Sequence, residues 1–196
     1  METASDTNLQ EKLARIEKLR TSESVVISGN EIEANSDIKI YRENAKKYGL
    51  SLRNIYRNKD RNCLIYLSKG SIKEVISHNI SEEQLKSVAA IPKIIENAIY
   101  LHSIENEDKE KHPDVQYYEY YVCGLRINKI EYTVKAVVAN STTGKRYYDH
   151  LLTSIEKGRL ISLTAAISHH GNEINLPNSG VKDKRLLRIL QEILEK

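Results

Sequence analysis

The sequence contains no phenylalanine and no tryptophan, and its 196 residues include only 2 cysteines, 3 prolines and 8 glycines. Because glycine and proline are scarce and 40% of the residues are hydrophobic, collagen-like, low-complexity and disordered chains are excluded. No apolar run approaches the roughly 20 residues of a membrane-spanning helix, and no apolar stretch follows the polar N-terminus as in a secretory signal. We therefore expect a globular, cytoplasmic protein that does not contact a membrane.

The charges of the chain nearly balance, with 30 Lys and Arg against 27 Asp and Glu, so any attraction for nucleic acid has to come from a local patch. Cys63 and Cys123 form no CxxC pair. Free thiols are favoured, but the sequence leaves a disulfide open. The chain has no Walker A or GxGxxG loop, and the adjacent His169 and His170 lack zinc-site spacing. The sequence thus predicts neither a cofactor nor a metal ion.

Helical periodicity dominates the first half of the chain, and the turn signals that interrupt it divide this half into short elements. A capping signature begins the last of these helices at Ser81, and Pro92 is expected to kink or restart it. The expected elements are, in chain order, a helix over residues 9–19, a strand over 25–27, a helix over 36–48, a hairpin over 51–68, a short helix ending near 78 and a helix over 81–101.

From Gln116 to His150 the period of hydrophobicity changes to two, which is typical of strands with two different faces. Turn signals at residues 128–129 and 141–144 divide this region into an antiparallel meander. The predicted fold class is α+β, with N-terminal helices followed by an antiparallel meander of about four strands and a C-terminal helix over 183–196. The expected segments are an N-terminal helix and strand in 1–36, a main domain in 37–158 and a C-terminal extension in 159–196.

Twelve tyrosines are the only large aromatic residues, and seven of them lie between Tyr117 and Tyr148. If the second hairpin pairs Asn140 with Lys145, Lys135 stands directly across from His150. One face then collects Tyr118, Tyr120, Val122, Thr133, Lys135, Val137, Arg146, Tyr148 and His150. Its two cations, its histidine, its hydroxyl and its three tyrosines suit phosphates and bases. The other face is the expected core: Tyr121, Cys123, Leu125, Tyr132, Val134, Ala136, Val138, Tyr147 and Leu151. A one-residue slip would exchange these faces for the last strand, and the polar face also fits an ordinary solvated sheet.

Three runs of the sequence resemble the large polyvalent protein-associated domain 3 family, whose members occur in long proteins of phages and conjugative elements: SVAAIPKIIENAIY (87–100), YYEYYVCGLRINKIEYTVKAVVAN (117–140) and GKRYYDHLLTSIEKG (144–158). The resemblance covers roughly residues 32–158. It implies a relationship to the barnase–EndoU–colicin E5/D–RelE group of nucleases, whose plan is N-terminal helices followed by an antiparallel sheet.

The resemblance implies metal-independent RNA cleavage, in which a base takes the ribose 2′-hydroxyl proton and an acid protonates the leaving 5′-oxygen. Histidine suits both transfers because its pKa is about 6.5. His150 is the first candidate and His78 the second, with Glu74 four residues before it; a histidine at a helix C-terminus also has a purely structural explanation. The other catalytic candidates are Lys135, Arg146 and Tyr148, and the substrate-binding candidates are Lys73, Thr133, Tyr118 and Tyr120.

The functional prediction is therefore an RNA-cleaving domain of a phage or mobile-element polyvalent protein. A tRNA-directed toxin or counter-defence effector is the form that the resemblance favours, with RNA as one partner and a protein inhibitor or immunity protein as another. The alternative is a non-catalytic module that binds nucleic acid or protein. The two differ in whether His150, His78 and the cations converge within hydrogen-bond reach of one phosphate-sized spot. If His150 and Lys135 lie on opposite faces of the sheet, catalysis by that pair is excluded.

Overall fold

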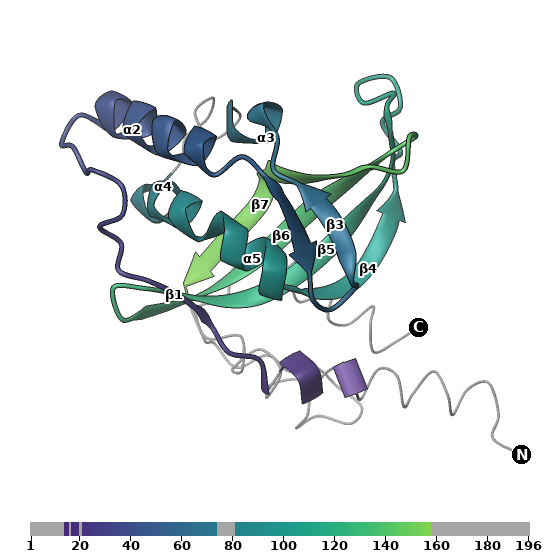
Figure 1. Ribbon diagram of the computed structural model, residues 1–196, viewed down its shortest axis with the longest axis horizontal. Helices are drawn as coiled ribbons and strands as arrows, with labels where there is room; N and C mark the ends of the chain where they lie inside the picture. Colours follow the sequence, from purple (N-terminus) through teal and green to yellow (C-terminus); the bar gives the residue numbers. More distant parts are fainter. Residues whose placement is uncertain (1–13, 16, 20, 74–80, 158–196) are drawn as a thin grey trace, which may run out of the picture.

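The computed structural model describes residues 14–157 apart from 16, 20 and 74–80, and it does not describe the side chains of 150–154 and 156. Figure 1 shows a strongly curled sheet with helices packed on one of its faces. This mixture of helices and a curled sheet is compatible with the expected α+β class. His78, the extension 159–196 and its expected helix lie outside the described residues. No helix in the described part of the chain is long and apolar enough to cross a bilayer.

The elements follow one another along the chain in an order that brings most helices before the long strands. They are β1 (Val25–Ile27), α2 (Ile38–Ser51), β2 (Ile55–Asn58), β3 (Cys63–Tyr66), α3 (Lys69–Lys73), α4 (Glu82–Ser87), the 3₁₀ turn η2 (Val88–Ala90), α5 (Ile91–Asn97), β4 (Ile99–Glu105), β5 (Val115–Ile127), β6 (Ile130–Ser141) and β7 (Arg146–Lys157).

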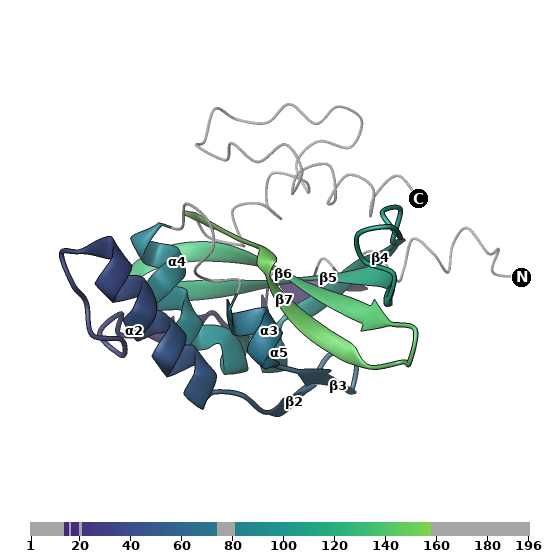
Figure 2. The same ribbon diagram turned by 90° about the horizontal axis from the view of Figure 1, so that it is seen from above.

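The sheet is larger than the predicted meander of about four strands. Strands β4 to β7 pair antiparallel in succession, but the described sheet has seven strands in the order β1-β5-β6-β7-β3-β2, with β4 also beside β5. Two of its pairings, β1–β5 and β3–β7, are parallel. The sequence pattern missed them because they join residues far apart in the chain. In Figure 2 the hairpin β2–β3 curls round to the side of the sheet that the helices cover.

The helices begin where their capping residues predict. The Asp37 carboxylate accepts a hydrogen bond from the Lys39 amide at 2.8 Å, and Ser81 forms the predicted capping box at the start of α4. Helix α2 continues past the expected stop at Gly49, and this glycine lies in a close contact where a Cβ would be 2.9 Å from Ile72. The predicted helix over 81–101 ends early, since residues from Ile99 onward pair with β5 as β4.

The first long hairpin has the predicted register, with Ile127 opposite Ile130 and both turn residues at positive φ. The predicted register of the second hairpin is wrong by one residue. Asn140 pairs with Arg146, because the loop of residues 142–144 is closed by a hydrogen bond from the Ser141 amide to the Lys145 carbonyl at 2.8 Å. This slip turns Arg146 and Tyr148 toward the helices, and Tyr147 away from them.

The core lies between the helices and the face of the sheet that they cover. Its largest buried side chains there include Leu85, Ile91, Ile94, Leu125 and Tyr121. The expected core face is confirmed from Tyr121 to Val138, and Tyr148 takes the place expected for Tyr147. The opposite face of the sheet is also buried in part, and is not the ordinary solvated face that the sequence allowed: Val122, Thr133 and Val137 are at most 2% exposed.

Candidate functional site: a buried carboxylate between two arginines

The predicted catalytic residues do not gather on one face of the sheet. Arg146 lies on the helix-covered face, whereas Lys135 lies on the opposite one, where its Nζ is 4.8 Å from the centre of the Tyr120 ring. Lys135 pairs with Ser154 and not with His150, because the pairing of β6 and β7 is irregular between Lys135 and Val137. The predicted juxtaposition of Lys135 and His150 is therefore wrong.

The other predicted residues are also divided. Tyr148 is 1% exposed in the core, and Thr133 is 2% exposed on the opposite face. Tyr118 and Tyr120 are half-buried on that same face, and the His102 ring stacks on Tyr120 with the ring centres 4.9 Å apart. Lys73 is exposed at the end of α3. Of the predicted set, Arg146 is the residue that we find inside a charged cluster on the helix-covered face.

Arg146 lies beside Glu119, a carboxylate that is only 2% exposed. The Arg146 Nε donates to both carboxylate oxygens, at 3.3 and 3.4 Å, and the Tyr121 hydroxyl donates to Oε2 at 2.8 Å. The Arg61 guanidinium lies 4.0 Å from Oε1, and the Cys63 thiol lies 3.9 Å from the Tyr121 hydroxyl. We call these five residues the Glu119 cluster.

The turn between β2 and β3 brings Arg61 to this cluster. Asn58, which is fully buried, holds the turn: its amide donates to the carbonyls of Ile95 and Ala98, both at 2.8 Å, and its carbonyl accepts from the Arg61 amide. The Arg61 guanidinium then lies over the Tyr100 ring, 4.2 Å from its centre. A residue distant in sequence is thus fixed beside β5.

The protonation of the cluster follows from its burial. Burial, then the charge of Glu119 and the hydrogen bond to it, raise the pKa of the Tyr121 hydroxyl far above its usual value, so Tyr121 remains a donor. Burial lowers the pKa of Arg146, but the charge of Glu119 and the hydrogen bond to it, together with Cys63 and Tyr117, outweigh burial, so the net pKa is raised. Two guanidinium groups thus face one carboxylate, and this excess of positive charge favours a bound anion.

Asn140 adds a further polar group beside Arg146. It is the Cα partner of both Tyr117 and Arg146, so the three side chains leave the sheet on the same face. Asn140 is 2% exposed, and its Nδ2 has no hydrogen-bond partner among the described residues.

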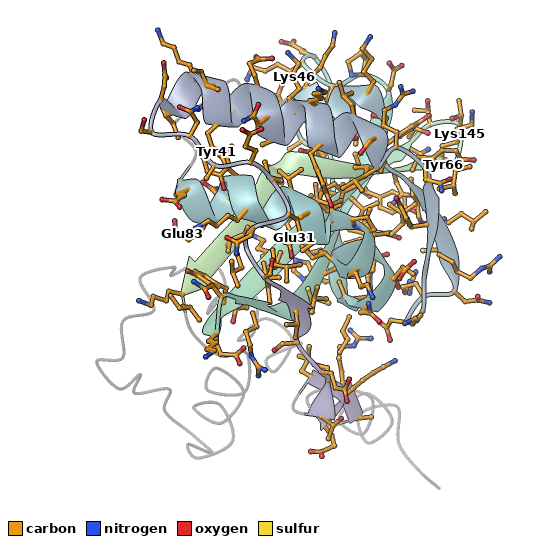
Figure 3. The ribbon with its side chains drawn as sticks, turned by 60° about the vertical axis from the view of Figure 1, so that its left-hand side comes forward. Glu31, Tyr41, Lys46, Tyr66, Glu83 and Lys145 are labelled. Atoms are coloured by element: carbon orange, nitrogen blue, oxygen red, sulfur yellow. The ribbon has the colours of Figure 1, made fainter. Side chains whose placement is uncertain are left out.

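A basic and aromatic edge lies at the junction of β3 and β7. The rings of Tyr66 and Tyr147 have centres 5.6 Å apart, and the Lys145 Nζ lies 5.9 Å from the centre of the Tyr66 ring. Figure 3 shows Tyr66 and Lys145 close together at this edge. Because Tyr147 directly follows Arg146 in β7, the edge and the cluster lie on opposite faces of one strand.

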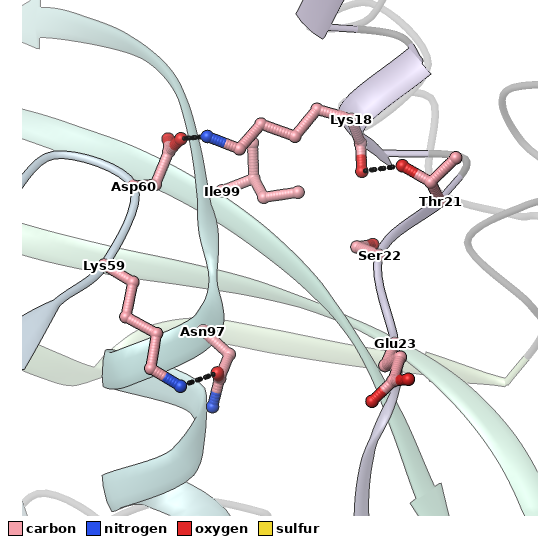
Figure 4. Close-up of a pocket in the computed structure, with 8 residues that line it drawn as sticks. All are labelled: Lys18, Thr21, Ser22, Glu23, Lys59, Asp60, Asn97 and Ile99. Carbon is pink, nitrogen blue, oxygen red and sulfur yellow. Dashed lines mark hydrogen bonds and ion pairs between the residues drawn. The ribbon is translucent and has the colours of Figure 1, made fainter.

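A separate groove of about 290 Å³ lies on the far side of the β2–β3 turn, against the segment that precedes β1 (Figure 4). Lys18 pairs with Asp60 across it, and the Lys59 Nζ donates to Asn97 at 2.7 Å. Its described cations thus have acidic or amide partners, so it offers less net attraction for an anion than the Glu119 cluster does. In the described part of the chain, no three His, Cys, Asp or Glu side chains gather as metal ligands.

The sequence prediction missed Glu119 and Arg61. Glu119 could have been found, because it lies two residues before Tyr121 on the expected core face, where a charged residue is unusual. Arg61 gave no such signal, since its position depends on the curl of the sheet. Cys63 and Cys123 are both free thiols, and burial raises the pKa of Cys123 to about 12, so it is a poor nucleophile.

Fold and site together define a domain with helices on one face of a curled, mainly antiparallel sheet and, on that face, two partly exposed arginines around a buried carboxylate. The chain belongs to the large polyvalent protein-associated domain 3 family, whose family model matches residues 36–148, more than half of the chain. The matched range contains the whole Glu119 cluster and Asn140. No curated protein and no solved structure matched the chain.

Proposed function

We propose that this domain binds RNA and cleaves it without a metal ion at the Glu119 cluster. The observation that supports this best is the placement of a buried carboxylate 3.3 Å from Arg146 and 4.0 Å from Arg61. A carboxylate serves as a general base, and paired guanidinium groups stabilise the charge that develops on a phosphate. The resemblance to the barnase–EndoU–colicin E5/D–RelE nucleases supports the same reaction.

In the proposed mechanism, Arg61 and Arg146 turn toward the substrate phosphate and release Glu119. Glu119 takes the proton of the ribose 2′-hydroxyl, and the resulting oxyanion attacks the adjacent phosphorus. The bond from phosphorus to the 5′-oxygen then breaks, leaving a 2′,3′-cyclic phosphate and a 5′-hydroxyl. For the acid that protonates the 5′-oxygen we retain the predicted His150, which lies four residues after Arg146 in β7. The edge formed by Tyr66, Tyr147 and Lys145 offers a surface for a neighbouring nucleotide.

A second candidate function is RNA binding without cleavage. It is favoured by the 2% exposure of Glu119 and by the hydrogen bonds that both of its oxygens already accept. In that case Glu119 only holds the two arginines in place for a phosphate. The resemblance also leads us to propose a tRNA-like substrate, and a protein inhibitor that covers the cluster where the host has to survive the enzyme.

The test is incubation of the protein with bacterial RNA in EDTA, with analysis of the termini of any products. Wild-type protein should yield 2′,3′-cyclic phosphate ends. Glu119→Gln should lose about 100-fold or more in rate, as expected for a general base, and Arg146→Ala about 100- to 1000-fold, as expected for a group that stabilises the transition state.

The matched control is the pair formed by Arg126 and Glu131, whose Nε and Oε1 atoms lie 2.6 Å apart. Arg126→Ala removes the same kind of ion pair outside the cluster and should leave the rate unchanged. If wild-type protein binds RNA without cutting it, and Glu119→Gln binds equally well, the second candidate replaces the first. If the Arg126 and Arg146 variants lose activity equally, the cluster is not the site.

A further inference from the structure

Three asparagine side chains of the described chain are buried, and they differ in one respect. Asn58 donates two hydrogen bonds from Nδ2 and accepts one at Oδ1. Asn106 does the same, with donation to the carbonyls of His112 and Val115 and acceptance from the Asp108 amide. Asn140 is as deeply buried, but its Nδ2 has no partner among the described residues.

A buried donor without an acceptor lowers the stability of a fold, and native structures contain few of them. Such a group therefore calls for a functional explanation. A leucine of similar shape would fill the same space without that cost, so the stability of the fold does not require an asparagine at this position. An acceptor that is bound during function would account for it.

The surroundings of Asn140 indicate which acceptor this is. The neighbouring side chain on β7 is Arg146, which keeps 26% of its surface exposed while its Nε is engaged by Glu119. Arg61 adds a second positive charge from the β2–β3 turn. Two guanidinium groups and one amide donor match an oxyanion with several acceptor oxygens, and phosphate has this geometry.

We infer that Asn140 donates from Nδ2 to a non-bridging phosphate oxygen and forms a phosphate subsite together with Arg146. This inference deepens the proposed function, because an RNA phosphodiester would supply the oxygen there. It requires only that a phosphate binds, and not that RNA is cleaved. Asn140 is thus assigned as a substrate-binding residue, next to the groups that carry the reaction.

The test compares Asn140→Leu with Asn106→Leu, the same substitution at a buried asparagine whose hydrogen bonds are complete. The probes are inorganic phosphate and a single-stranded RNA oligonucleotide with 2′-deoxy linkages, which cannot form the cyclic product. Asn140→Leu should keep or raise the midpoint of thermal unfolding. It should lower the affinity for both probes about 10-fold, as expected for a lost hydrogen bond to a charged group. Asn106→Leu should lower the midpoint and leave the affinity of the folded protein unchanged.

Asn140→Asp provides a second variant, because the carboxylate can pair with Arg146 and keep the fold while it repels phosphate. Asn140→Asp should lower the affinity for phosphate more than Asn140→Leu does. The inference is overturned if Asn140→Leu binds both probes as the wild type does, if it unfolds as readily as Asn106→Leu, or if wild-type protein binds neither probe. If phosphate binding depends on Asn140 while wild-type protein leaves RNA intact, the subsite stands and the proposed cleavage fails.

Discussion

Replacing Arg146 with alanine should destabilise the protein through the charge that it leaves behind. Glu119 would stay 2% exposed, with the Tyr121 hydroxyl at 2.8 Å as its donor and Arg61 4.0 Å away as the nearest remaining cation. Removing one partner of a buried ion pair costs about 3–5 kcal/mol. We expect a cost at or just below the lower end of this range, about 2–3 kcal/mol, because Arg61 remains and the Arg146 hydrogen bonds are long.

The assay is urea unfolding followed by far-UV circular dichroism, since the chain has no tryptophan for fluorescence. Glu119→Gln in the Arg146→Ala background removes the unpaired charge and keeps an acceptor for Tyr121. The double variant should therefore recover at least about 1 kcal/mol relative to Arg146→Ala, a coupling that is usual for groups in direct contact. The reasoning is refuted if Arg146→Ala costs less than about 0.5 kcal/mol, the usual range for a surface substitution, or if the double variant is no more stable than the single one.

Three further predictions concern the sheet and the pH dependence of stability. Gly124→Ala should cost about 1–3 kcal/mol in urea unfolding, because its Cβ would lie 3.3 Å from the Ser24 Cα and closer still to the Ser24 side chain; Gly70→Ala, with more room, should cost nothing, and equal losses would contradict the packing argument. Lys129→Gly should raise stability by about 1 kcal/mol, because Lys129 has φ 68° in a turn that favours glycine; a lower urea midpoint would contradict it. Burial raises the pKa of Cys123 to about 12, and burial with Glu119 raises that of Tyr121. In the unfolded chain the Cys123 thiol and the Tyr121 hydroxyl ionise with pKa values of about 8.5 and 10. The unfolded chain therefore loses these protons before the folded protein does, so the free energy of unfolding is unaffected below about pH 8.5 and falls as the pH rises; a urea midpoint that stays flat to pH 11 would refute this.

Local signals in the sequence predicted the elements that depend on local interactions. The caps at Asp37 and Ser81 and the turn after Ile127 are stabilised by residues within a few positions of one another, so they could be recognised. The second hairpin depends on whether its loop has two or three residues between paired positions, and its sequence admits both. One extra residue in that loop was enough to exchange the faces of Arg146 and Tyr147.

The candidate site was predictable only in part for a related reason. Arg146 was named from its strand, but its partner Glu119 lies on β5 and depends on the correct faces of two hairpins. Arg61 depends on the contact of the β2–β3 turn with residues 95–98, which are distant in sequence. Lys135 lies on the face expected for it, and it pairs with Ser154 because the pairing of β6 and β7 is irregular between Lys135 and Val137. Long-range pairing of this kind leaves no periodic trace in one sequence.

The absence of phenylalanine gains a physical meaning at the Glu119 cluster. The Tyr121 ring packs edge-on against Tyr100, with the ring centres 5.6 Å apart, as a phenylalanine ring also could. Its hydroxyl, however, gives the buried Glu119 a donor that a phenylalanine lacks, and burial keeps that hydroxyl protonated. A core built from tyrosine can thus hold a carboxylate at the edge of its apolar interior, and the carboxylate in turn holds Arg146 beside Asn140, where we infer the phosphate subsite.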